Sequence, residues 1–159
     1  MRILGIDPGT NVTGYGLLEK TRDRYTNVQY GEIRNKRNHV LSSRLHSIYN
    51  RLIGIIEDAR PEVVSLEDIF YGKNIKSLIR QGHVRGIIIL AASNCGIPVY
   101  EYSPLEVKKA VVGYGLADKG QVQQMVKAIL QISELPPPDA SDALAIAICH
   151  ANFLKTDPI

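Results

Sequence analysis

Four carboxylates of the chain each stand beside an apolar run: Asp7, Glu67, Asp139 and Asp142. The first two end apolar runs of strand length, and the last two precede the longer apolar run 143–148. A charge in such surroundings needs compensation by a partner. Carboxylate oxygens bind Mg²⁺ and Mn²⁺, so a fold that gathers these four would form a site for such ions. Taken singly, each acid has a structural alternative as a helix cap, a first-turn charge or a solvated strand end.

The spacing of the acids gives this chemistry a geometry. Asp139 and Asp142 lie three positions apart, so on a helix both project from one face, and the positive helix end favours their charges. Asp7 and Glu67 would meet if their strands are parallel neighbours in a sheet. Two metal ions about 3.5–4 Å apart can hold the attacking water and the leaving oxygen of a phosphodiester. The matching reaction is hydrolysis of a nucleic-acid backbone.

The elements that must position these acids follow from periodicity and from turn residues. We expect three hairpin-connected strands, then strands alternating with helices, which together make an α/β mixed sheet flanked by helices. Capping signals at Ser103–Glu106 and at Asp118 with Gln121 predict two helix starts, and a further helix starts near Asp139. The expected strands are 2–7, 12–18, 25–33, 62–68 and 97–102, and the longer helices are 41–59 and 75–94.

Length and composition bound the class of protein. With 159 residues, 45% of them hydrophobic, the chain suits one well-buried core, so we expect a single domain, 1–159. The most apolar segment, Ile87–Ala92, is far shorter than the roughly 20 residues that span a bilayer. The N-terminus reads as a strand rather than a signal peptide. We therefore expect a cytoplasmic protein without a membrane partner, and we expect Cys95 and Cys149 to be small buried hydrophobes.

Basic residues are concentrated between positions 70 and 120, although the net charge is only +3. Only three acids, Glu101, Glu106 and Asp118, oppose them there. Basic surfaces of this kind attract phosphate backbones, whereas an ordinary solvated face is the alternative. The basic side chains of this stretch are Lys73, Lys76, Arg80, Arg85, Lys108, Lys109 and Lys119, and a second group comprises Arg34, Lys36, Arg37 and His39.

Several motifs, taken in order, carry a resemblance to a known family. They are Asp7-Pro8-Gly9-Thr10 with Val12-Thr13-Gly14-Tyr15-Gly16, Glu67, Glu106-Val107-Lys108, Ala117-Asp118-Lys119, and Pro138-Asp139-Ala140-Ser141-Asp142 with the apolar run that follows. In this order and spacing the chain resembles the RuvC family of bacterial Holliday-junction resolvases over nearly its whole length. The resemblance implies a ribonuclease-H-like five-stranded mixed sheet, a homodimer, and Mg²⁺-dependent nicking of two like-polarity strands at a four-way junction. It also implies cooperation with the RuvA–RuvB branch-migration complex.

The resemblance assigns roles to individual residues. Asp7, Glu67, Asp139 and Asp142 match the catalytic acids, which would hold two Mg²⁺ ions, with Mn²⁺ as a substitute. Lys108 and Lys119 match supporting lysines that stabilise charge on the scissile phosphate, and solubility is their alternative role. Phe70 matches an aromatic that stacks on unpaired bases at the crossover, and filling the core is its alternative. The expected DNA-binding surface comprises Phe70, Lys73, Lys76, Arg80, Lys108, Lys109 and Lys119.

The helix expected at 75–94 is apolar on every face after Gly86. One face must cover the sheet, so Ile87–Leu90 need a second apolar surface. Other helices of the same chain or a twofold partner could supply it, and the pattern alone does not choose between them. The family resemblance favours the twofold partner.

Two rival functions come from other classes. The string Gly5-Ile6-Asp7-Pro8-Gly9-Thr10 also resembles the phosphate-binding turn of actin-like ATPases and sugar kinases. Those enzymes need two domains around a nucleotide cleft, and this chain has residues for one. A non-catalytic junction-binding protein is the second rival. Such a protein has no need for four acids on a phosphate-binding face, where they would repel DNA.

Overall fold

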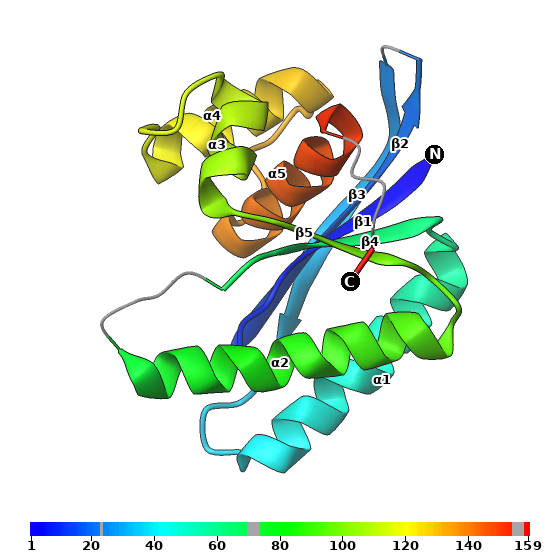
Figure 1. Cartoon of the computed structure of the whole chain (residues 1–159), viewed down its shortest axis with the longest axis vertical. Coiled ribbons are helices and arrows are strands. Elements are labelled where there is room, and N and C mark those ends of the chain that lie inside the picture. Colours follow the sequence, from blue (N-terminus) through cyan, green and yellow to red (C-terminus); the bar gives the residue numbers. More distant parts are fainter. Residues whose placement is uncertain (23, 70–73, 154–157) are drawn as a thin grey trace.

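The computed structural model describes residues 1–22, 24–69, 74–153 and 158–159. A five-stranded sheet in the order β3-β2-β1-β4-β5 separates two layers of helices (Figure 1). β1 pairs antiparallel with β2 and parallel with β4, while β2–β3 is antiparallel and β4–β5 parallel. This mixed sheet matches the expected fold class. The strands are β1 Arg2–Asp7, β2 Val12–Thr21, β3 Arg24–Arg34, β4 Val63–Glu67 and β5 Val99–Tyr102.

Helices cover both faces of the sheet. α1 Leu41–Ala59 and α2 Ile75–Asn94 lie on one face, and α3 Pro104–Val112, α4 Lys119–Leu130 and α5 Pro138–Asn152 lie on the other (Figure 1). The bounds of α1 and α2 are those expected from the sequence. β2 extends beyond Leu18 to Thr21 because its end pairs with the start of β3. β5 starts at Val99 rather than Ile97, after Pro98, which has no N–H for a strand ladder.

Alternation along the strands divides the apolar residues between two cores. On β1, Ile3 packs in the core beneath α5, whereas Leu4 and Ile6 pack in the core beneath α1 and α2. Successive side chains of a strand point to opposite faces, so Asp7 points to the α5 side. On β4, Leu66 packs toward α1 and α2, which directs Glu67 to the α5 side as well. The strand period therefore places both acids on one face.

Buried hydrogen bonds join β5 to α5 inside the core beneath α5. The hydroxyl of Tyr102 lies 2.8 Å from Nδ1 of His150 and donates to the Phe153 carbonyl at 3.1 Å. Burial lowers the pKa of His150 to about 4, so the imidazole is neutral at physiological pH. Tyr102 is also the β5 partner of Glu67 in the strand register, so these hydrogen bonds fix the strand beside that acid.

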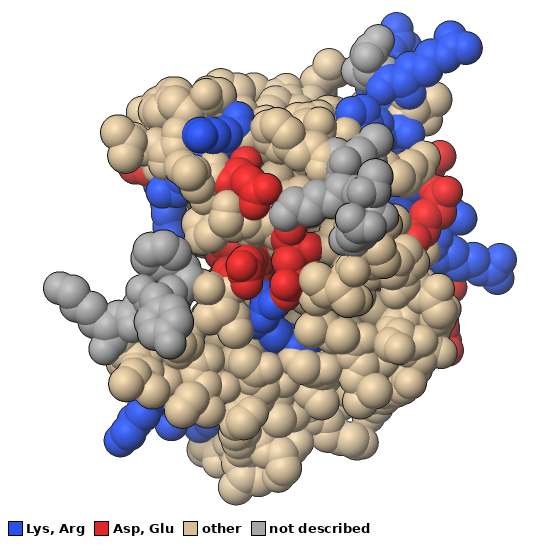
Figure 2. Space-filling model, viewed as in Figure 1, with Lys and Arg blue, Asp and Glu red and all other residues tan. Residues whose placement is uncertain are grey.

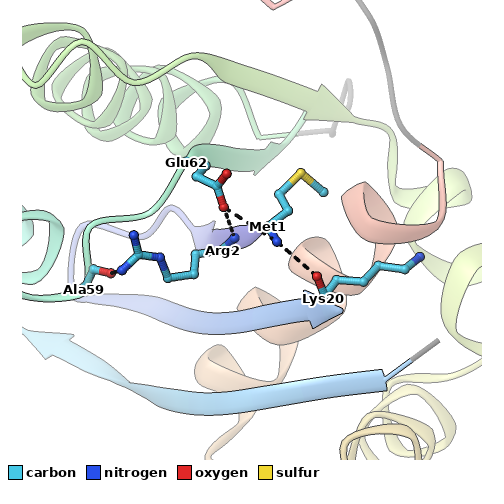
Figure 3. Close-up of polar contacts among 5 residues, drawn as sticks. All are labelled: Met1, Arg2, Lys20, Ala59 and Glu62. Atoms are coloured by element: carbon cyan, nitrogen blue, oxygen red, sulfur yellow. Dashed lines mark hydrogen bonds and ion pairs between the residues drawn. The ribbon is translucent and has the colours of Figure 1, made fainter. Parts of the chain in front are cut away.

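Hydrogen bonds anchor the start of the central strand β1 (Figure 3). The Met1 amino group donates to the Lys20 carbonyl at 3.0 Å. The Arg2 backbone N–H donates to Glu62 at 2.6 Å, and its guanidinium donates to the Ala59 carbonyl at 3.2 Å. The bond from the Arg2 N–H holds the pKa of Glu62 below its usual range. β1 is thereby tied at one end to both β2 and the segment before β4.

The two cysteines differ in exposure. Cys149 is buried in α5, as expected. Cys95 is exposed, so the expectation of a buried residue was wrong for it. The reason is its position at the C-cap of α2, where the helix ends and turns away from the core.

The sequence of α2 left open which surface covers its apolar residues. Val84, Ile88, Ala91 and Ala92 are buried, whereas Ile75, Ile79 and Leu90 are exposed.

Within the described ranges, no helix is both long enough and apolar enough to cross a membrane.

α5 crosses the first two strands at very close range. A Cβ atom on Gly5 would lie 2.1 Å from the Ala143 carbonyl oxygen, and one on Gly14 would lie 1.9 Å from the Asp139 carbonyl oxygen. Real Cβ atoms do not approach backbone oxygens so closely, so a side chain at either glycine requires α5 to move. Glycine at these positions lets the first two turns of α5 pack directly against the backbone of the sheet.

We expect Gly14→Ala to lower the free energy of unfolding by about 1–3 kcal/mol, because the new methyl group collides with the α5 backbone. Gly54→Ala is the matched control, since a Cβ there meets nothing within 4 Å and glycine inside helix α1 is unfavourable. That control should gain about 0.5–1 kcal/mol. Urea unfolding measures both changes. Equal stabilities for Gly14→Ala and the original chain would contradict the close approach.

Candidate active site

The four acids come from three elements that converge at one end of the sheet. Asp7 and Glu67 stand at the carboxyl ends of the parallel neighbours β1 and β4. Asp139 and Asp142 lie in the first two turns of α5. Asp7 is the register partner of Gly14, and the Asp139 backbone rests on that glycine. The close seat of α5 therefore brings its acids over the end of β1.

Neither α5 acid serves as the N-cap of its helix. The N-cap residue is Pro137, and no side-chain hydrogen bond caps this end. The helix-cap part of the structural alternative is therefore wrong, whereas Asp139 does lie in the first turn, as that alternative also expected. Their charges instead face the other acids, as the pKa of Asp7 shows.

The pKa of Asp7 is raised from its ordinary value of 3.8 to about 7. Burial is the largest cause, followed by repulsion from Asp142, Glu67 and Asp139. All three other acids are thus close enough to act on Asp7 electrostatically. A proton or a cation at this position relieves the repulsion.

Two lysines oppose the negative charge from the neighbouring helices. Burial, and next Asp142, raise the pKa of Glu67, while Lys119 and Lys108 lower it. Lys119 Nζ lies 3.1 Å from Asp142 Oδ2, and the charge of Asp142 raises the lysine pKa. The Lys119 side chain is 83% exposed, so its ammonium is paired with the site yet accessible from solvent. Both lysines therefore lie close enough to the four acids to offset part of their charge.

Helix capping fixes the positions of both lysines. Ser103 and Glu106 form a capping box at the start of α3, which carries Lys108. Asp118 and Gln121 form a second box at the start of α4, whose first residue is Lys119. Both capping boxes match the predicted ones.

A small cleft lies between α3, α4 and α5. It is lined by Glu67, Pro104, Val107, Lys108, Lys119, Val122, Asp142, Ala145 and Ile146.

The chemistry of the acid cluster suits a hard divalent cation. Its donors are carboxylate oxygens, and their mutual repulsion is only partly offset by Lys108 and Lys119. Among the described side chains, no group of three His, Cys, Asp or Glu is placed to hold a metal ion as the structure stands. The donor types and the charge therefore fit a cation, while the ligand set stays a prediction.

Comparison with known proteins identifies the family. The profile of the family described as crossover junction endodeoxyribonuclease RuvC matches residues 3–150. The chain belongs to the RuvC family. A relative of that name from Caldanaerobacter subterraneus is 52% identical over 96% of this chain and 93% of its own length. One from Desulfitobacterium hafniense is 49% identical over 98% and 94%.

Solved structures agree with this membership. Thermus thermophilus RuvC in complex with a Holliday junction substrate superposes with a TM-score of 0.89 at 33% identity, covering 96% of this chain and 93% of that one. The yeast mitochondrial Holliday junction resolvase Ydc2 shares the fold, with a TM-score of 0.64 at 16% identity over 92% of this chain and 76% of its own. Membership of the RuvC family decides against the kinase-like alternative.

The remaining residues expected at the DNA surface are distributed unevenly. Phe70 and Lys73 lie outside the described residues. Lys76 and Arg80 are exposed near the start of α2, and Lys109 is exposed on α3, but none of the three lines the cleft. Their assignment to the DNA surface of this RuvC chain stays a prediction.

Arg85 was counted among the basic side chains of the stretch 70–120, although not in the expected DNA-binding surface, and it is buried. Its residue exposure is 6%, and its guanidinium donates to the backbone carbonyl of Glu67 and pairs with Glu101. Figure 2, seen from the same side as Figure 1, shows acidic side chains gathered near the centre of this face, with Lys or Arg atoms touching them. The sequence signal for burial was the position of Arg85 directly before the apolar half of α2, which starts after Gly86.

The raised pKa of Asp7 makes a prediction about stability. The folded chain binds this proton more tightly than the unfolded chain, whose carboxyl titrates near 3.8. Below pH 4 Asp7 therefore carries no penalty. As pH rises from about 4 through 7, the penalty on the RuvC fold grows to about 4 kcal/mol, and it stays constant at higher pH. Asp7→Asn should remove this loss, so the variant should be more stable at pH 8 and equal near pH 4.

Urea unfolding with a metal chelator at both pH values measures this difference. Asp58→Asn, an exposed change on α1, is the control and should leave stability unchanged at both pH values. A destabilised Asp7→Asn variant at pH 8 would contradict the repulsion described for this site.

Proposed function

We propose that this chain is a structure-selective endonuclease that resolves Holliday junctions by paired nicking of two like-polarity DNA strands during recombination and repair. The observation that carries the proposal is the convergence of four acids and two lysines at one end of a RuvC-family fold. The similar Thermus thermophilus protein was solved with a Holliday junction substrate. A non-catalytic junction-binding protein would have no use for an acid cluster this repulsive.

The acids would hold the metal, and the lysines would act on the phosphate. Asp7, Glu67, Asp139 and Asp142 would bind two Mg²⁺ ions, or Mn²⁺ in their place. Such ions activate water and stabilise charge on the phosphodiester oxygens. Lys119, exposed beside Asp142, would approach the scissile phosphate from solvent. Lys108 lies on the cleft wall, and both ammonium groups would stabilise the charge that develops during cleavage.

The decisive assay incubates the chain with a synthetic four-way junction or a matched linear duplex, each with Mg²⁺ or with a chelator. We expect paired, symmetric nicks in the junction with Mg²⁺ only. Asp7→Asn should abolish cleavage, at least about 100-fold, while the variant still binds the junction, because a lost ligand charge disturbs metal placement more than DNA contact. Gel analysis of end-labelled strands separates these products. Binding without cleavage by the original chain would favour the non-catalytic alternative.

A homodimer through α2 forms part of the proposal. Ile79 and Leu90 are 54% and 49% exposed on this helix. Gly82 and Gly86 lie on the same outward side, because a Cβ on either would meet nothing within 4 Å. Glycines on an exposed helix face let another helix approach closely. A twofold partner there would present two active sites to a nearly twofold junction.

Leu90→Asp should convert the dimer into monomers, because a buried, unpaired carboxylate is unfavourable in an apolar interface. Sedimentation velocity measures the assembly state. Leu135→Asp is the matched control, since Leu135 is 44% exposed outside any helix or strand. We expect the monomer to lose paired nicking. A Leu90→Asp protein that remains dimeric would place the interface elsewhere.

Three finer assignments complete the proposal. The RuvC-type nuclease domain would comprise residues 1–159. The protein would act in the cytoplasm, and it would work with the RuvA–RuvB branch-migration complex.

A further inference from the structure

Arg85 joins α2 to β4, the strand that carries Glu67, on the face of the sheet opposite the cleft. One guanidinium nitrogen donates to the backbone carbonyl of Glu67, and another pairs with the Glu101 carboxylate on β5. Only 6% of the residue is exposed. Arginine keeps its charge in such places and presents several donors in a fixed plane, so it can hold two acceptors at once.

Glu67 is the last residue of β4 and has no register partner on β1. The β1–β4 ladder ends at the pair Ile6 and Leu66, so Glu67 lies one residue beyond it. β5 supports it on the other side through the partner Tyr102. The side chain of Glu67 points toward α5, while its carbonyl accepts the bond from Arg85. Arg85 therefore fixes the backbone from which the Glu67 carboxylate projects.

α2 presents Arg85 inward and the proposed dimer face outward. Arg85 directly precedes Gly86 in this helix, and a helix moves largely as one body. A shift of α2 therefore displaces the guanidinium and with it the support of Glu67. We propose that Arg85 is a positioning residue that couples the seating of α2 to the placement of the Glu67 carboxylate. This inference rests on the proposed nuclease function of the same site.

A plain structural role is the competing explanation, in which Arg85 only neutralises Glu101. Two variants separate the roles. Glu101→Gln removes the ion pair and keeps the donor to Glu67. The double variant Arg85→Met with Glu101→Gln removes both contacts, and it leaves neither a buried guanidinium nor an unpaired Glu101 carboxylate. The difference between the two variants isolates the contact with Glu67.

The measurements are Mn²⁺ binding by electron paramagnetic resonance, junction affinity, and the cleavage rate at saturating junction. We expect Glu101→Gln to stay near the original chain. The double variant should bind Mn²⁺ and cleave about 10–100-fold less well, as is usual when support of a ligand is lost. Its junction affinity and dimerisation should be unchanged. Arg51→Met, an exposed change on α1, is the control for loss of an arginine.

Each outcome decides the question. Equal Mn²⁺ binding and cleavage in both variants, whether normal or reduced, would overturn the role of the Glu67 contact. If the double variant fails to fold, Arg85→Gln with Glu101→Gln replaces it, because the glutamine side chain is two bonds shorter than arginine and does not reach the Glu67 carbonyl. Wild-type Mn²⁺ binding in that variant would also overturn the inference. An original chain that neither binds Mn²⁺ nor cuts the junction refutes the proposed function instead. Normal behaviour of the original chain with no difference between variants refutes only the role of Arg85.

Discussion

The direct packing of α5 against the glycine backbone of β1 and β2 is the constraint on which the rest of the site depends. A Cβ at Gly5 or Gly14 would lie 2.1 or 1.9 Å from an α5 carbonyl oxygen, far closer than the 3.0 Å that real Cβ contacts keep. The absence of these two methyl groups lets the first two turns of α5 lie directly on β1 and β2. Asp139 and Asp142 then act on Asp7 across the contact. Because protein interiors transmit strain, bulk anywhere along this crossing would separate the acids even without touching one of them.

The same approach creates an electrostatic penalty, which the fold offsets from two directions. Burial and three neighbouring acids raise the pKa of Asp7 to about 7, so the cluster is unfavourable without added positive charge. Lys108 and Lys119 act on Glu67 from the helices that form the cleft, where a phosphate could reach them. Arg85 acts from the opposite side, buried and held by two acceptors. The two lysines of the cleft can therefore act on a substrate, while the buried Arg85 holds the backbone of the site in place.

Local signals in the sequence predicted the elements well, because the decisive residues act within a few positions. The capping boxes at Ser103 and Asp118 needed only neighbours along the chain, and both formed. Arg85 and Cys95 were misplaced for a different reason. α2 mixes polar and apolar residues up to Arg85 and is apolar on every face after Gly86, so periodicity does not say which side of the helix is covered. The burial of Arg85 depends instead on the positions of Glu67 and Glu101. The close contact at Gly14 likewise depends on where α5 crosses the sheet, which no local pattern encodes.

α2 has two faces with different tasks, and this division explains its unusual sequence. Its inner face packs Val84, Ile88 and Ala92 on the sheet and inserts one charged side chain toward the ends of β4 and β5. Its outer face offers exposed apolar residues and glycines without close neighbours. If a second copy docks there, as proposed, the energy of docking acts on the helix that also supports Glu67. An enzyme that must nick two strands in concert gains from such a connection, because a site with a poorly seated α2 would also hold its acids poorly.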